Sequence, residues 1–313
     1  MNSKILLTGK SGQVGSELLH LLPALGELAA FDWQEMDLAN PDEIRRVVRE
    51  VRPTLIVNAA AYTAVDQAEK EEAAASAINA EALAVLAAEA KMLGAALVHY
   101  STDYIFDGTK RAPYVEDDAP NPINAYGRTK LAGEQAIRNS GVPHLIFRTE
   151  WVYARQGRNF LLTILRLATE REEIKIVADQ IGAPTTSVEL ARATTEILTQ
   201  LLEPHANRPS FPEVSGTYHM TAAGQTTWHQ FAHAILEEAS GADQSIPWIA
   251  AATGGKPLIA RRVTPILTED YPTPARRPAY SVLSNARLAQ TFGVQLPDWR
   301  AQLHDIFSAA PRD

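Results

Sequence analysis

The sequence contains no cysteine, and this absence excludes disulfide bonds, metal sites built on thiolates and cysteine nucleophiles. A reducing compartment is compatible with it. The sequence also lacks a block of basic residues, since 29 Lys and Arg stand against 37 Asp and Glu, a formal net charge of -8. A protein that binds the phosphate backbone of a nucleic acid needs a concentrated positive surface. We therefore expect no nucleic-acid partner.

Long apolar runs are scarce as well. The first one, residues 5–7, is closed by Thr8 and Gly9 and is too short for the apolar region of a signal peptide. We find no stretch that approaches the roughly 18 apolar residues of a membrane span. The sequence therefore predicts a cytoplasmic protein with no membrane partner.

Short apolar runs and helical patterns alternate along the first half of the chain. The predicted strands are residues 5–7, 28–31, 55–57, 97–100 and 144–147, and the predicted helices are residues 14–22, 42–51, 72–93 and 124–137. This alternation predicts a parallel sheet covered by helices on both faces. The expected fold is α/β, a doubly wound NAD(P)-binding Rossmann fold.

The pattern loosens after residue 150, where stretches rich in Pro and Gly interrupt the helices. We expect residues 1–150 to form the dinucleotide-binding domain and residues 151–313 to form mainly a smaller substrate-binding lobe, because loop-rich segments commonly carry binding residues. Residues 217–220 are predicted to form one more strand. Part of residues 185–225 is therefore expected to return to the first domain.

A glycine turn follows the first predicted strand and opens the first helix, with Gly9, Gly12 and Gly15 at its key positions. A pyrophosphate at this turn would meet free helix N–H groups and the positive end of the helix dipole. Asp32 ends the second strand, where an acidic residue typically accepts a hydrogen bond from the ribose 2′-OH. The residues after Asp32 offer no cation for a 2′-phosphate, which favours NADH over NADPH unless a cation comes from elsewhere.

Tyr126 and Lys130 are the strongest catalytic signal, because four residues of helix place them on the same face. An ammonium there would favour the phenolate and lower the pKa of the phenol, and such a phenol can protonate the alkoxide that forms when hydride reaches a ketone. Such a pair occurs by chance in many helices. Here, however, the hydroxyl of Thr102 lies at the carboxyl end of an upstream strand, the edge where open α/β sheets bind ligands.

Together these residues match the Ser/Thr-Tyr-Lys arrangement of the extended short-chain dehydrogenase/reductase superfamily. Further motifs run from the first strand to near the end of the chain: NAAAYTAVDQAE (58–69), STDYIFDG (101–108), NAYGRTKLAGE (124–134), FRTEWVY (147–153), DQIGAPT (179–185) and YPTPARRP (271–278). With these motifs the chain resembles the dTDP-4-dehydrorhamnose reductases.

The resemblance implies NAD(P)H-dependent reduction of the 4-keto group of dTDP-4-dehydro-6-deoxy-L-mannose to dTDP-L-rhamnose, with a nucleotide sugar as the small-molecule partner. It also implies roles for residues of this chain. Thr102, Tyr126 and Lys130 would be catalytic, and Thr102, Asp103 and Trp151 would contact the substrate. The cofactor would be held by Gly9, Gly12, Gln13, Val14, Gly15, Asp32, Asp37, Leu38, Ala61, Tyr62, Thr63, Tyr126 and Lys130.

Some expectations stay open at this level. Glu150 departs from the small residue that the resemblance leads us to expect before Trp151. Some members of the family use Mg²⁺ at a dimer interface, and Glu17 and Glu189 fall at similar positions, but isolated surface glutamates are common and the metal is left unknown. The chain is expected to be a monomer or a homodimer. His99 and His219 are expected to be hydrogen-bonded core residues rather than metal ligands.

Two other functions compete with the reductase. One is a different sugar-nucleotide dehydrogenase or epimerase, since fold and catalytic residues are shared within the superfamily and the C-terminal pocket selects the substrate. The other is a non-catalytic regulatory subunit, because the resemblance extends to a subunit of methionine adenosyltransferase built on this fold. The intact Thr102, Tyr126 and Lys130 argue against the second.

Overall fold

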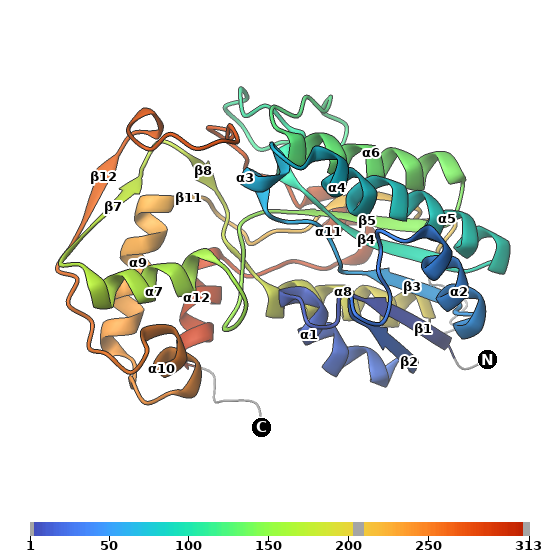
Figure 1. Ribbon diagram of the computed structural model, residues 1–313, viewed down its shortest axis with the longest axis horizontal. Helices are drawn as coiled ribbons and strands as arrows, with labels where there is room; N and C mark the ends of the chain where they lie inside the picture. The colour runs from blue at the N-terminus through green and yellow to red at the C-terminus, as the bar shows by residue number, and fades with distance from the viewer. Residues whose placement is uncertain (1–2, 203–209, 309–313) are drawn as a thin grey trace.

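The computed structural model describes residues 3–202 and 210–308, which form two lobes (Figure 1). The strands are β1 (Ser3–Thr8), β2 (Gly26–Phe31), β3 (Leu55–Asn58), β4 (Ala96–Thr102), β5 (His144–Thr149), β6 (Val152–Tyr153), β7 (Glu173–Val177), β8 (Ile181–Gly182), β9 (Thr185–Thr186), β10 (Gly216–His219), β11 (Thr226–Thr227) and β12 (Arg262–Ile266). The α-helices are α1 (Gln13–Leu21), α2 (Pro41–Val51), α3 (Val65–Ala68), α4 (Glu72–Ser76), α5 (Ala82–Leu93), α6 (Ala125–Ser140), α7 (Phe160–Glu170), α8 (Ser187–Leu202), α9 (Trp228–Gly241), α10 (Pro247–Thr253), α11 (Ala286–Phe292) and α12 (Trp299–Ser308). Single turns are η1 (Leu22–Ala24), η3 (Asp103–Ile105) and η4 (Thr268–Asp270), and η2 (Ala77–Glu81) is a π-helical turn.

The larger lobe is built on a parallel sheet with the strand order β10-β5-β4-β3-β1-β2. Its apolar residues alternate between the two faces, as the two-residue period of a strand requires. Ile5 and Leu7 of β1 pack with residues of α1 and α8 on one face, while Leu6 packs with residues of α2 and α5 on the other. This arrangement confirms the predicted doubly wound α/β fold.

The edge strand β10 comes from far along the chain, and it pairs in parallel with β5. It carries Tyr218 and His219 into the sheet, and α8 and α11 cover the same region of the first face. The division into a dinucleotide-binding domain at residues 1–150 and a substrate-binding lobe after it stays a prediction.

A continuous helix runs from Glu72 to Leu93 through α4, η2 and α5. It is long and apolar enough, by length and composition, to cross a membrane. The prediction that no stretch approaches this size is therefore wrong. One such helix is weak evidence, because the core helix of a soluble protein passes the same test. Here α5 packs on α2 and α6, and its buried alanine and leucine side chains join the core on the second face of the sheet.

The smaller lobe has a core of its own, formed where α7, α9 and α12 meet. Leu161 and Ile164 of α7 and Phe231 and Ile235 of α9 are fully buried there. β7 pairs in parallel with β12 beside these helices, at the far end of the lobe in Figure 1.

Candidate active site

The glycine turn adopts the shape that a phosphate-binding turn needs. Gly9 has a positive φ of 73°, and a Cβ there would lie 2.8 Å from the backbone N of Ala60. A Cβ on Gly15 would lie only 1.9 Å from the carbonyl oxygen of Gly9, so Gly15 lets α1 pack against the turn. Gly12 is the N-cap of α1 and supplies no side-chain cap. The first N–H groups of α1 can therefore bind an anion.

A cavity of about 460 Å³ brings most of the predicted cofactor residues together. It lies where the strand order reverses, because β1 pairs with β2 on one side and with β3 on the other, and this is where open α/β sheets bind ligands. The predicted residues that line it are Gly9, Gly12, Gln13, Val14, Asp32, Asp37, Leu38, Ala61, Thr63, Tyr126 and Lys130. This lining fits a dinucleotide.

The predicted residues outside this lining have other neighbours. Gly15 serves the packing of α1. The phenol of Tyr62 donates a hydrogen bond to Glu71 Oε2 at 2.8 Å, and its backbone N–H donates to Asn79 Oδ1 at 2.9 Å. Tyr62 thus holds the loop after β3, whose residues Ala61 and Thr63 line the cavity.

A cation that the sequence did not suggest lies near Asp32, outside the lining of this cavity. Lys10, inside the glycine turn, forms a 2.6 Å ion pair with Glu35 Oε2. The same Glu35 oxygen accepts a hydrogen bond from the backbone N–H of Asp32 at 2.9 Å. Lys10 and Asp32, the expected ribose ligand, therefore contact the same carboxylate oxygen of Glu35. A lysine inside the glycine turn was the available signal.

The start of α6 is fixed by side-chain and backbone contacts. Asn124 caps the helix, because its Oδ1 accepts from the N–H of Gly127 at 2.8 Å and its Nδ2 donates to the carbonyl of Arg276 at 2.8 Å. A Cβ on Gly127 would lie 2.1 Å from the carbonyl oxygen of Tyr104, so glycine allows α6 to approach η3. These contacts place Tyr126 beside the ends of β4 and β5.

Lys130 is 1% exposed, and its ammonium contacts strand β4. Nζ donates to the carbonyl of Tyr100 at 2.6 Å and lies 3.1 Å from His99 Nε2. His99 Nδ1 in turn lies 3.0 Å from the amide of Asn58. Burial lowers the pKa of Lys130 to about 7. His99 is thus a hydrogen-bonded core residue, as expected, but it also contacts the candidate catalytic lysine.

Tyr126 is 9% exposed, and its ring packs edge-on against Tyr104 with centroids 5.7 Å apart. Burial raises the pKa of the phenol, the charge of Asp103 raises it further, and a hydrogen bond with Thr102 lowers it. The expectation that Lys130 lowers this pKa is therefore wrong. The reason is that the ammonium is held by Tyr100 and His99 while the phenol is desolvated.

Thr102 and Asp103 lie at the carboxyl end of β4 and are both buried. The hydroxyl of Thr102 donates to Asp103 Oδ1 at 2.9 Å and accepts from the N–H of Tyr104 at 3.1 Å. Burial raises the pKa of Asp103 to about 6. Glu150, the unexpected residue before Trp151, is buried nearby, and its Oε2 accepts from the Ser281 hydroxyl at 2.9 Å.

Trp151 connects the two lobes. Its φ of 46° lies in the left-handed region, and its indole stacks on Trp228 of α9 with ring centroids 3.5 Å apart and planes 10° apart. A Cβ on Gly182 would lie 2.6 Å from the same indole. The predicted contact with a sugar ring stays a prediction.

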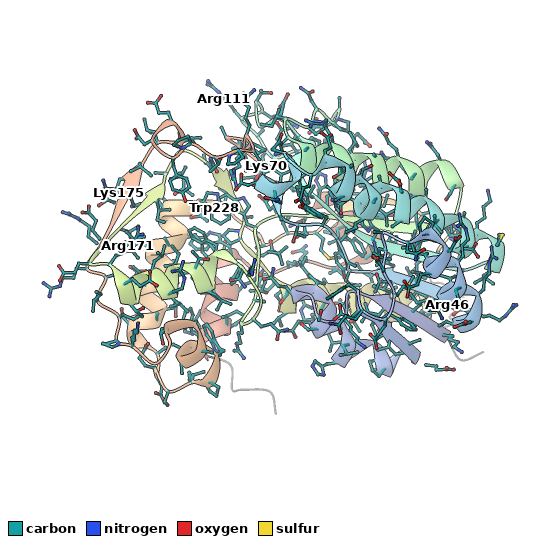
Figure 2. The ribbon with its side chains drawn as sticks, in the orientation of Figure 1. Arg46, Lys70, Arg111, Arg171, Lys175 and Trp228 are labelled. Carbon is teal, nitrogen blue, oxygen red and sulfur yellow. The ribbon has the colours of Figure 1, made fainter. Side chains whose placement is uncertain are left out.

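Trp228 also lines a cavity of about 380 Å³ formed mostly by the smaller lobe, with Asp66 of α3 at its lining as well. Its lining includes the aromatic residues Phe160 and Tyr271 and the cationic residues Arg171, Lys175 and Arg277, beside aliphatic ones. Asp66 pairs with Arg277 at 2.8 Å, so Arg171 and Lys175 are the cations that this carboxylate does not neutralise. Figure 2 shows Arg171 and Lys175 toward the outer end of this lobe and Trp228 further in. Such a mixture suits a ligand with both a ring system and negative charge.

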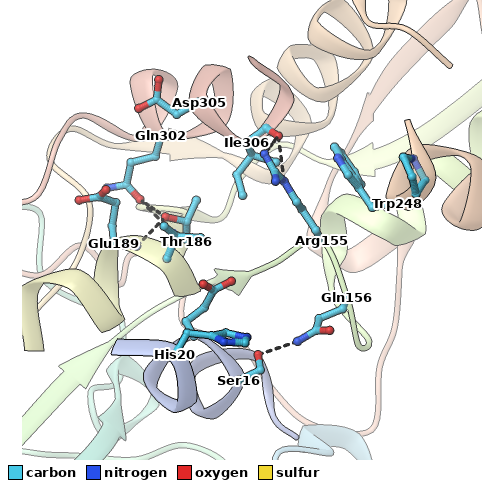
Figure 3. Close-up of a pocket in the computed structure, with 13 residues that line it drawn as sticks. Ser16, His20, Arg155, Gln156, Thr186, Glu189, Trp248, Gln302, Asp305 and Ile306 are labelled. Atoms are coloured by element: carbon cyan, nitrogen blue, oxygen red, sulfur yellow. Dashed lines mark hydrogen bonds between the residues drawn. The ribbon is translucent and has the colours of Figure 1, made fainter. Parts of the chain in front are cut away.

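A third cavity, of about 560 Å³, contains both candidate metal ligands from the sequence, Glu17 and Glu189. Figure 3 shows His20 and Ser16 of α1 facing Glu189 of α8 and Asp305 of α12 across it. Residues 3–202 and 210–308 contain no group of three His, Asp or Glu arranged to hold a metal ion. The donor set therefore does not fit a metal site within one chain, and we derive no step through Mg²⁺.

Other residues of the site were also missed. Gly157 and Arg158, after β6, line the cofactor cavity, and Asn159 Nδ2 donates to Gln13 Oε1 at 3.0 Å, which ties the loop before α7 to the glycine turn. Tyr100 lines the cavity as well. These residues carry no motif that could have identified them.

Comparison with known proteins places this geometry in a family. Residues 3–311 match the family described as the RmlD substrate binding domain. The chain is 51% identical to a dTDP-4-dehydrorhamnose reductase of Burkholderia thailandensis over 95% of each sequence. It is 44% identical to the protein of that name from Escherichia coli, over 97% of this chain and 98% of that protein.

Among solved structures, a dTDP-4-dehydrorhamnose reductase of Bacillus anthracis in complex with NADP is 35% identical, with a TM-score of 0.85 over 98% of this chain and 99% of that one. A UDP-glucose 4-epimerase of Thermus thermophilus in complex with NAD has a TM-score of 0.73 at 20% identity, which shows a shared fold alone. The resemblance drawn from the sequence motifs is confirmed. The chain belongs to the family of the RmlD substrate binding domain.

Proposed function

We propose that the protein is an oxidoreductase that uses NAD(P)H to reduce the 4-keto group of dTDP-4-dehydro-6-deoxy-L-mannose to dTDP-L-rhamnose. The observation that carries the proposal is a single cavity whose lining combines the glycine turn with Tyr126 and Lys130. The reductase names of the relatives and the NADP complex of the Bacillus anthracis protein support it.

In this reaction the nicotinamide, when bound, supplies a hydride to the carbonyl carbon. Tyr126 donates its phenolic proton to the oxygen that becomes an alkoxide, and its raised pKa keeps that proton in place at neutral pH. Thr102 orients the carbonyl beside it. Lys130, fixed by Tyr100 and His99, would hold the ribose next to the nicotinamide.

The nucleotide sugar would bridge the two lobes. We place its sugar at Trp151 and its nucleotide in the cavity behind Trp228, where Arg171 and Lys175 would meet the diphosphate and Phe160 or Tyr271 the base. The stacked indoles link these two positions. A substrate seated this way keeps its keto group at the edge of the sheet that carries Thr102 and Tyr126.

The direct test is to supply dTDP-4-dehydro-6-deoxy-L-mannose with NADH or NADPH and to follow the loss of nicotinamide absorbance. A reductase consumes one NAD(P)H for each sugar reduced. An epimerase of the same superfamily would recycle its cofactor without net loss, and a regulatory subunit would consume none. No stoichiometric consumption with either cofactor would refute the proposal.

The remaining expectations stay predictions. They are the cytoplasmic location, the monomeric or homodimeric state, and the assignment of residues 151–313 to substrate binding. We also propose that both nicotinamides are accepted, because Asp32 favours NADH whereas Lys10 lies close enough to attract a 2′-phosphate.

A further inference from the structure

Two buried carboxyl groups come directly after the paired ends of β4 and β5, where Thr102 lies opposite Thr149, and the reaction proposed above does not use them as a pair. Asp103 and Glu150 are each 2% exposed. One oxygen of each, Asp103 Oδ2 and Glu150 Oε1, is buried without a hydrogen-bond partner. Within residues 3–202 and 210–308 neither carboxyl forms an ion pair. Two buried carboxylates without a cation would be costly if both were charged.

Ser281 lies between the two groups. Its hydroxyl donates to Glu150 Oε2 at 2.9 Å, and it also lies within reach of the Asp103 carboxyl, although in poorer geometry, since Asp103 Oδ2 keeps no partner. A serine has a single proton to donate. It can satisfy both carboxyl groups only if one of them is protonated and donates in return.

The other groups that face the pair are neutral at pH 7. They are the hydroxyl of Thr102, backbone N–H groups, and the phenols of Tyr104, Tyr126 and Tyr280. Arg277 acts on Tyr104 from further away and is itself paired with Asp66 at 2.8 Å. Burial, followed by the charge of Asp103, raises the pKa of Glu150 well above its ordinary value.

Hydroxyl groups connect this carboxyl pair to Tyr126, the proposed proton donor. Asp103 Oδ1 accepts from Thr102 at 2.9 Å, and Thr102 lies close enough to Tyr126 to lower the pKa of its phenol. Because Thr102 also has one proton, it cannot donate to Asp103 and to Tyr126 at once. The charge on Asp103 therefore decides which way the Thr102 hydroxyl points.

We propose that Asp103 and Glu150 together hold one proton at neutral pH, and that this proton restores the phenol of Tyr126 through Thr102 after each reduction. The proposal rests on the proposed reductase function. Glu150 is then a positioning residue, since it acts through Asp103 and touches no reacting atom.

The proton steps balance as follows. Tyr126 loses its O–H proton to the alkoxide and becomes a phenolate. If the shared proton lies on Glu150, it first moves to Asp103. Thr102 then gives its hydroxyl proton to the phenolate and takes the proton of the Asp103 carboxyl. The pair is left as two anions until it takes one proton from solvent, which is the proton that the reduction of a ketone by NAD(P)H consumes.

The shared proton can be measured in the full-length protein without any substrate. The infrared spectrum at pH 7 should contain the C=O band of a protonated carboxyl, sensitive to D₂O, that Glu150→Gln abolishes. At pH 5 the band should return in that variant, because Asp103 alone then takes a proton. Glu89→Gln is the matched control: Glu89 is also a buried glutamate, but it is ion-paired with Arg49 at 2.7 Å, so its loss should leave the band unchanged.

The relay is tested by the pH dependence of kcat. In the wild-type protein the raised pKa of Glu150 lets the pair keep its proton above the pH at which Asp103 alone would lose it. In Glu150→Gln only Asp103 remains, with a pKa of about 6, so kcat should equal the wild-type value at acid pH and fall roughly tenfold per pH unit above that pKa, with KM unchanged. A purely structural role would lower kcat equally at every pH.

Two results would overturn the proposal: no protonated carboxyl band in the wild-type protein at pH 7, or a pH profile of kcat in Glu150→Gln that follows the wild-type profile. If Glu150→Gln does not fold, the infrared titration of the wild-type protein decides alone. If the wild-type protein does not reduce the nucleotide sugar, the proposed function fails. An active wild-type protein with an unchanged variant profile means that only the relay fails.

Discussion

Tyr126→Phe removes one oxygen atom from the centre of the candidate active site. The ring keeps its edge-on contact with Tyr104 and its packing against Ala68 and Ala75. The variant should therefore fold, because it loses no packing contact and one hydrogen bond of the phenol costs at most about 0.5–1.5 kcal/mol of unfolding free energy. It loses the proton donor to the alkoxide, however, and removal of a general acid lowers rates by about 10² to 10⁴. That range corresponds to about 2.7–5.5 kcal/mol of barrier.

The assay follows NAD(P)H absorbance with saturating dTDP-4-dehydro-6-deoxy-L-mannose, and nicotinamide fluorescence measures cofactor binding separately. Tyr104→Phe is the matched control, because it removes the phenol oxygen of the neighbouring ring. We expect Tyr126→Phe to bind NAD(P)H normally and to lose kcat, while Tyr104→Phe keeps both. A kcat near the wild-type value in Tyr126→Phe would remove this residue from the mechanism and with it the main argument for a reductase.

Three further variants test other parts of the structure. NADH should be accepted at least comparably to NADPH because of Asp32. A preference for NADPH above about tenfold in kcat/KM, ~1.4 kcal/mol, would contradict this. Glu35→Gln should raise kcat/KM for NADPH, because it frees Lys10 from its ion pair. Trp151→Ala should raise KM for the nucleotide sugar while NAD(P)H binding survives, and an equal loss of cofactor affinity would assign the indole to the core. Glu134→Gln leaves the buried Arg148 without its bidentate carboxylate partner. The free energy of unfolding, measured by urea titration, should therefore fall by about 3–5 kcal/mol. A change below about 1 kcal/mol would mean that the pair of Glu134 and Arg148 contributes little to stability.

Much of the fold and part of the site follow from short-range patterns. The alternation of apolar runs and helical patterns predicted five strands in the first half of the chain, and all five lie in one sheet. This succeeded because the apolar residues that each element must bury recur within a few positions of one another. The glycine turn was visible for the same reason, since Gly9 and Gly15 meet within one turn. Tyr126 and Lys130 line one cavity because one helical turn separates them.

The electrostatics of the site could not be predicted in this way. The partners of Lys130 lie about 30 residues upstream, on β4, and the lysine points to them rather than to the phenol that its spacing suggests. Glu150 was visible as an unexpected residue, yet its partner Ser281 lies 131 positions away. If the Glu150 carboxyl lay on the surface, water would solvate it and it would be ionised at neutral pH. Its charge here depends on whether Asp103, Ser281 and Glu150 are buried together, and only the folded chain brings these three side chains to one place.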